Sequence, residues 1–153
     1  MKGEPTMSNT PDISTWKAIK LTKKVIRTPY ISINQKVGRV GFNMAACNLI
    51  PEIFFFPYCT PLHKEDEQGN VSVGFLFSKD PTDNCLNLHK TMSKGEHPDV
   101  TNAFIYSKPL AEELAKYLAF TEDNAIFHAA TSGKVILYAT QRITTPHPNT
   151  KGA

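Results

Sequence analysis

The sequence lacks the features of several large classes of protein. No apolar run approaches the roughly 20 residues that a helix needs to cross a bilayer, and no hydrophobic signal segment follows Lys2. The cysteines, Cys47, Cys59 and Cys85, are odd in number and do not have the spacing of a disulfide framework. These absences predict a cytoplasmic protein in a reducing compartment, with no membrane partner.

The signatures of common enzymes are also missing. The chain has no glycine-rich phosphate loop, no Gly-x-Ser-x-Gly nucleophile elbow and no His-Glu-x-x-His helix. Cys47 lies among the small residues of MAAC, which indicates a buried, inert thiol rather than a nucleophile. His128, in AIFHAA, is more typical of a structural histidine on a strand than of a base. The sequence therefore predicts a protein that is not an enzyme, with no catalytic residues and no cofactor.

Acidic residues are absent from one basic segment, residues 16–39, which reads WKAIKLTKKVIRTPYISINQKVGR. The whole chain carries a formal charge of only +3, so the positive charge is concentrated in this segment. Two interpretations stay open: a solvated face with a mobile arm, or a surface that contacts phosphates. The basic residues of the segment are Lys17, Lys20, Lys23, Lys24, Arg27, Lys36 and Arg39.

The residues that are present can build one compact domain. The chain has 153 residues, is 41% hydrophobic and contains nine Phe, five Tyr and one Trp, which is enough for a core. Its two ends, MKGEPTMSNTPD and TTPHPNTKGA, are rich in Pro, Thr and Asn. We expect a disordered tail over residues 1–15, a globular domain over 16–141 and a flexible tail over 142–153.

The first half of the domain shows the periodicity of strands around a short helix. PYISIN alternates with Ile31 and Ile33 on one face, RVGFN alternates again, and MAACNLI changes to a helical period that Pro51 ends. EIFFFPYC is a β-prone run, and VSVGFLFS alternates after a polar loop. The expected order is strand, strand, short helix, strand, strand.

The second half repeats that order. CLNLH and NAFIYS are expected strands, SKPLAEELAKYLAF is a helix capped by Ser107, and DNAIFHAATSGKVILYAT is a strand, a turn and a strand. RVGFNMAACNLI aligns with AFIYSKPLAEEL, and NVSVGFLFS aligns with GKVILYAT. The predicted fold is α+β and mostly β, built of two β-β-α-β-β units over about 28–79 and 84–140.

The stretch KVGRVGFNMAACNLI, with the hairpin that ends near Ser78, resembles the swapped-hairpin DNA-binding domains of the AbrB, MazE and SpoVT type. Gly38, Arg39 and Val40 match the Gly-Arg turn of that family, and SKPLAEELAKYLAF…SGKVILYAT matches its helix and hairpin. The resemblance implies two units in tandem that form one pseudo-twofold barrel. Several phage proteins are similar in the YISIN…GR opening, which implies a phage origin and the host-cell cytoplasm as location.

The same resemblance implies a small DNA-binding or regulatory protein. The positions that match the family's binding turn are Lys36 and Arg39, and only Arg39 has the fork that suits a guanine edge. The competing interpretation is that Arg39 pairs with an acid across the turn. A basic arm would add phosphate contacts from Lys20, Lys23, Lys24 and Arg27.

An assembly protein is the alternative function, as a virion component or a homo-oligomer, with other protein subunits as partners. The stretch FFFPY, residues 54–58, favours this alternative if alternate rings are exposed, because large exposed apolar patches usually mark interfaces.

The stretches CTPLH and CLNLH offer weak candidates for a metal site, namely Cys59, His63, Cys85 and His89. A strand would spread each Cys-x-x-x-His set over about 13 Å, which is too wide for one zinc ion unless the strand breaks. Pro61 could break CTPLH, but no residue breaks CLNLH. The sequence therefore predicts no metal site.

Overall fold

Nine strands form a single sheet in the computed structural model, which describes residues 14–19 and 28–144. The strands are β2 (Tyr30–Asn34), β3 (Arg39–Phe42), β4 (Tyr58–Glu65), β5 (Val71–Ser78), β6 (Leu86–Asn87), β7 (His89–Met92), β8 (Val100–Tyr106), β9 (Asn124–Ser132) and β10 (Ile136–Arg142). The helical segments are α2 (Met44–Asn48), the short 3₁₀ helix η1 (Ile53–Phe55) and α3 (Lys108–Tyr117).

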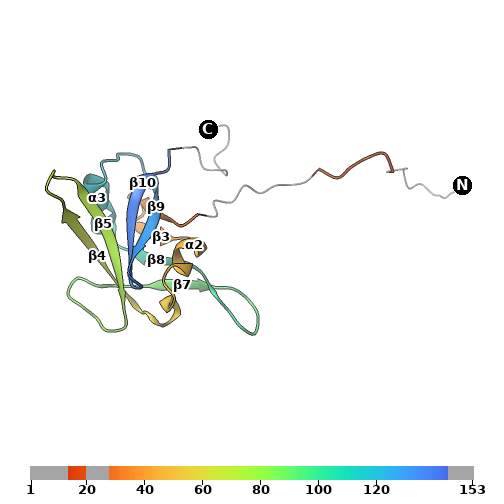
Figure 1. Ribbon diagram of the computed structural model, residues 1–153, viewed down its shortest axis with the longest axis horizontal. Helices are drawn as coiled ribbons and strands as arrows, with labels where there is room; N and C mark the ends of the chain where they lie inside the picture. The colour runs from red at the N-terminus through yellow and green to blue at the C-terminus, as the bar shows by residue number, and fades with distance from the viewer. Residues whose placement is uncertain (1–13, 20–27, 145–153) are drawn as a thin grey trace, which may run out of the picture.

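The sheet curls into a nearly closed antiparallel barrel (Figure 1). Its strand order is β6-β4-β5-β10-β9-β2-β3-β8-β7, and the two end strands are separated in the chain by Leu88 alone. The stretch from β6 to β7 therefore pairs with β4 through its first part and with β8 through its second part. The mostly-β class expected from the sequence is confirmed.

Aromatic rings fill the inside of the barrel. Phe42 meets Phe75 and Phe77 edge to face, with ring centroids 5.2 and 5.4 Å apart. All three rings are fully buried, as are Ile31 and Ile33 on β2. The alternation read from these strands is thus the alternation between the core and the outer face.

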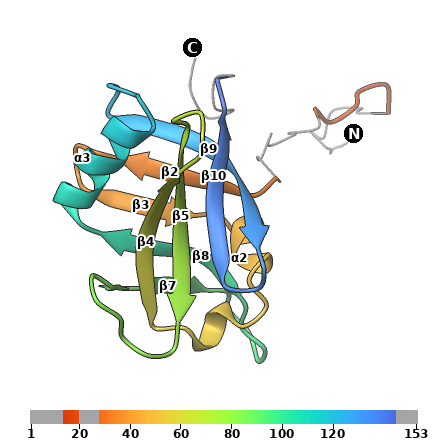
Figure 2. The same cartoon turned by 60° about the vertical axis from the view of Figure 1, so that its left-hand side comes forward.

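The two helices lie at opposite ends of strands β2, β3 and β8 (Figure 2). α3 begins as the sequence predicts, since Ser107 Oγ accepts a hydrogen bond from the Leu110 amide at 3.2 Å. α2 is capped in the same way by Asn43, whose Oδ1 accepts a hydrogen bond from the Ala46 amide at 3.0 Å. Asn43 Oδ1 also accepts from the Tyr30 amide at 2.9 Å, which ties α2 to the start of β2.

The aromatic run EIFFFPYC is not a strand, contrary to its β-propensity. Ile53–Phe55 form η1, and β4 begins only at Tyr58. Pro51 and Pro57 flank this turn and have no backbone N–H to donate to a ladder. The Lys90 ammonium donates to the carbonyls of the turn, and this contact is not visible in the local sequence.

The stretches CTPLH and CLNLH behave opposite to expectation. β4 runs unbroken through Pro61, which is paired with Phe75 of β5. On its other side β4 pairs with β6 only at Tyr58 and Cys59, so Pro61 takes an edge position where no amide is needed. CLNLH is interrupted at Leu88, where the chain leaves β4 and joins β8.

The barrel strands run from Tyr30 to Arg142. Trp16 and Ile19 are 76% and 86% exposed, so the start of the expected domain contributes nothing to the core. No helix in residues 14–19 and 28–144 is long and apolar enough to cross a membrane. Most of the expected tails over 1–15 and 142–153, namely residues 1–13 and 145–153, lies outside the described residues, as do Lys20, Lys23, Lys24 and Arg27 of the basic arm.

Candidate functional site

Strands β3, β8 and β7 are neighbours in the sheet (Figure 2). Three aromatic side chains and one arginine from these strands lie together on their outer face. Phe104 of β8 is paired with His89 of β7 and with Gly41 of β3, while Tyr106 is paired with Arg39. We call His89, Phe104, Tyr106 and Arg39 the aromatic surface. Tyr106 is 51% exposed, although its neighbour Ile105 is fully buried in the barrel.

Ring contacts hold the aromatic surface together. The His89 and Tyr106 ring centroids are 5.1 Å apart at an interplanar angle of 68°, and Phe104 and Tyr106 are stacked with centroids 6.3 Å apart. The Arg39 guanidinium carbon lies 5.6 Å from the Phe104 centroid, within the range of a cation–π contact. The surface therefore combines exposed ring area with a positive charge.

Arg39 does not form an ion pair with any carboxylate among the residues that the structure describes. The ion pairs there are Lys79 with Glu52, Lys116 with Glu113, and Arg142 with Glu122. The interpretation that Arg39 pairs with an acid across its turn finds no support in this part of the chain. Its charge is available to an anion from outside.

Two exposed lysines lie at one end of the aromatic surface. Lys36 is in the turn between β2 and β3, and Lys108 follows β8 as the first residue of α3. The two segments touch at Gly38, whose carbonyl accepts from the Ser107 amide at 2.8 Å. A Cβ on Gly38 would lie 2.6 Å from the Lys108 Cα, so only glycine permits this approach.

The sequence indicated Lys36 and Arg39 but not the residues around them. Tyr106 and Phe104 alternate with buried Ala103 and Ile105, so the period of NAFIYS already places both rings on the outer face. Their meeting with Arg39 depends on the pairing of β3 with β8, which joins positions far apart in the chain. No local sequence pattern predicts the pairing of β3 with β8.

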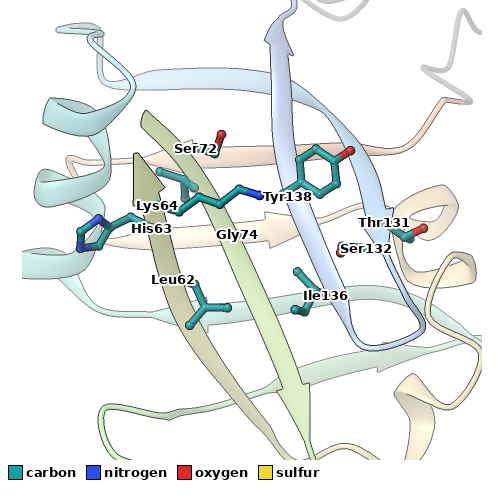
Figure 3. Close-up of a pocket in the computed structure, with 10 residues that line it drawn as sticks. Leu62, His63, Lys64, Ser72, Gly74, Thr131, Ser132, Ile136 and Tyr138 are labelled. Atoms are coloured by element: carbon teal, nitrogen blue, oxygen red, sulfur yellow. The ribbon is translucent and has the colours of Figure 1, made fainter. Parts of the chain in front are cut away.

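A groove on another part of the barrel crosses β4, β5 and β10 and has a volume of about 460 Å³ (Figure 3). Its floor is Gly74, which pairs with Leu62 of β4 and Tyr138 of β10. Lys64 and several hydroxyl groups line its rim. His63 also borders the groove, but its ring points away from the floor (Figure 3). It is stacked on the ring of Tyr117 of α3, with ring centroids 4.7 Å apart.

The weak metal candidates do not converge. Cys59 is fully buried inside the barrel, His63 is stacked on α3, and His89 belongs to the aromatic surface. Cys85 is only partly buried, ahead of β6. Among the described residues there is no group of three or more His, Cys, Asp and Glu side chains that could hold a metal ion.

Comparisons with known proteins give no match. No protein-family model, no curated protein and no solved structure matches this chain.

A second aromatic cluster is exposed at η1. Phe54 and Phe55 are 53% and 62% exposed, and their rings meet edge to face at 5.1 Å. Phe56 turns inward and is 7% exposed. The exposed rings of FFFPY are thus the adjacent pair Phe54 and Phe55, rather than the alternate rings that the sequence hypothesis required.

Burial controls the chemistry of two thiols. Desolvation raises the pKa of Cys47 to about 12, with an opposing contribution from the charge of Lys90. Desolvation also raises the pKa of Cys59, which is fully buried. The expectation of a buried Cys47 is confirmed, and both thiols are protonated near neutral pH.

Proposed function

We propose that this protein binds nucleic acid through Lys36, Arg39 and the aromatic surface. The observation that supports this most is Arg39 itself, which lies over the Phe104 ring and has no carboxylate partner among the described residues. An arginine in this position can bind phosphate while its plane rests on an aromatic ring. Lys20, Lys23, Lys24 and Arg27 remain predicted additional phosphate contacts.

The same proposal includes a duplicated, swapped-hairpin-like barrel. The two halves of the chain correspond strand by strand: β2 to the stretch from β6 to β7, β3 to β8, β4 to β9, and β5 to β10. When each strand is exchanged for its counterpart, every strand pairing becomes a pairing that is also observed. The β2 with β3 pair becomes β7 with β8, β4 with β5 becomes β9 with β10, and β2 with β9 becomes β6 with β4. The pairs β3 with β8 and β5 with β10 exchange with themselves. This exchange supports the duplicated barrel that the AbrB-type resemblance implies; a regulatory role in a phage-encoded protein remains part of the proposal.

Binding of labelled DNA at low salt tests the proposal. We expect the full chain to bind, and Lys36→Ala and Arg39→Ala each to weaken binding. Lys134→Ala is the matched control, because this exposed lysine lies in the turn between β9 and β10. Absence of binding at low salt, or equal loss with Lys134→Ala, would contradict the proposal.

A second candidate function is assembly through protein contacts at η1, favoured by the exposed rings of Phe54 and Phe55. In that case the full chain forms oligomers in sedimentation experiments, and Phe54→Ser with Phe55→Ser reduces their mass. A chain that stays monomeric, and whose behaviour these changes do not alter, would remove this candidate.

A further inference from the structure

The aromatic surface has the form of a platform open on one side. Tyr106 is 51% exposed at the end of β8, whereas Val100, Ala103 and Ile105 of the same strand are buried in the core. His89 contacts the Tyr106 ring edge to face, which supports the ring from the neighbouring strand and leaves ring area open to solvent. The exposed ring thus has a fixed orientation before any ligand binds.

Gly41 makes this platform possible. A Cβ at Gly41 would lie 3.3 Å from the Phe104 ring and 2.8 Å from Ser32 Oγ. The missing side chain leaves space over β3 that the Phe104 ring occupies, and Arg39 then covers the Phe104 ring. Phe104 is therefore the floor of the surface, and Tyr106 is its accessible ring.

The charge around the platform is positive. Arg39 lies beside the rings, and Lys36 and Lys108 are exposed at the end where the β2 to β3 turn meets α3. None of these three is in an ion pair within the described part of the chain. Open ring area flanked by uncompensated cations is complementary to a polyanion that carries flat, stackable groups.

We infer that the aromatic surface takes single-stranded nucleic acid, with a base stacked on Tyr106 and phosphates on Arg39, Lys36 and Lys108. This inference rests on the proposed nucleic-acid-binding function. In a duplex each base is stacked between its neighbours, so its face is closed to a side chain, whereas a single strand offers the face of every base. A platform of exposed ring area on a sheet therefore fits a single strand.

The direct test measures the anisotropy of a labelled oligothymidine of about 12 nucleotides with the full chain, beside a duplex of equal length. We expect the single strand to bind at least about tenfold tighter than the duplex, and Tyr106→Leu to remove about tenfold of that affinity. Tyr106→Phe keeps the ring and binds as the unaltered chain does. Tyr138→Leu, a change of a tyrosine in the Gly74 groove, leaves binding unchanged. Circular dichroism confirms that each variant is folded.

An abasic phosphodiester strand of the same length separates stacking from charge. It binds the unaltered chain weakly, and Tyr106→Leu does not weaken it further. If Arg39→Ala lowers affinity while Tyr106→Leu does not, and duplex and single strand bind equally, the stacking inference is overturned and the proposed function survives. If the unaltered chain binds neither oligonucleotide at low salt, both the stacking inference and the proposed function are contradicted.

Discussion

Arg39 lies directly opposite Tyr106 in the antiparallel pairing of β3 with β8, and its guanidinium rests over the ring of Phe104. One pairing of strands thus places a cation and an exposed tyrosine side by side. Because the two residues belong to different halves of the chain, the candidate site exists only when β3 is paired with β8.

Arg39 should contribute one phosphate contact to the salt dependence of binding. For a single strand, each neutralised phosphate makes the plot of log affinity against log salt concentration steeper by about 0.7. Arg39→Ala is therefore expected to reduce the slope by about 0.7, whereas Lys134→Ala should leave it as it was. An unchanged slope for Arg39→Ala would show that this side chain does not contact phosphate.

Gly38 fixes the position of the basic turn, and its replacement should be costly. Gly38→Ala combines a positive φ of 75° with a Cβ 2.6 Å from the Lys108 backbone. Gly133→Ala is the control, because its φ of 71° is similar but no atom lies within 4 Å of the added carbon. We expect a loss of about 1 kcal/mol in the free energy of unfolding for Gly133→Ala, and a further loss of about 1–3 kcal/mol for Gly38→Ala. Urea denaturation measures both, and equal losses would contradict the close approach to α3.

Lys90 should stabilise η1 from the side of β7. Its ammonium donates to the carbonyls of Ile53, Phe54 and Phe56 at 3.1, 2.9 and 2.8 Å. Lys90→Met keeps the apolar stem and removes the charge-assisted bonds, so we expect a loss of about 2 kcal/mol in the free energy of unfolding. Lys94→Met, at an exposed position, should be neutral within about 0.5 kcal/mol. A neutral Lys90→Met would mean that the bonds do not hold the turn.

The buried thiols predict both a reactivity and a pH dependence. In the folded chain at pH 8 an alkylating reagent should modify Cys85, the partly buried thiol, and spare Cys47 and Cys59 until the chain is unfolded. Mass spectrometry of labelled peptides distinguishes these sites. Labelling of Cys59 as fast as Cys85 in the folded chain would contradict its place inside the barrel.

The pH dependence follows from the raised pKa of Cys47. The folded state holds this proton up to about pH 12, whereas the unfolded thiol releases it near pH 9.0. The stability from the buried neutral thiol is therefore complete below pH 9.0 and is lost as the pH rises toward about 12. Urea midpoints for the unaltered chain should fall over this range, and those for Cys47→Ala should fall less.

Local signals predicted the elements better than their registers. The helix after Ser107, and the hairpin of β9 and β10, follow from a cap, a proline and a Ser-Gly turn. The alignment of the two halves, however, placed Phe42 over Tyr106, although one ring is fully buried and the other is half exposed. A shift of one residue exchanges the two faces of a strand, and only the tertiary pairing fixes it.

The sequence indicated the charges of the candidate site and the outward direction of its two rings on β8, but not the contact between them. Lys36 and Arg39 stand out in an acid-free segment, whereas the partners of Arg39 come from β8, a strand in the second half of the predicted duplication. The aromatic run at residues 53–57 misled the strand prediction, since proline on both sides and a distant lysine favour a turn there.

Photo-cross-linking of a 5-iodouracil-substituted single strand to the full chain tests the central claim most directly, because it reports where bound bases lie. The account predicts cross-linked peptides from β7 and β8, containing His89 or Tyr106, that disappear with Tyr106→Leu. Cross-links confined to other aromatic residues, such as Tyr138 of the Gly74 groove or Phe54 and Phe55 of η1, would contradict it.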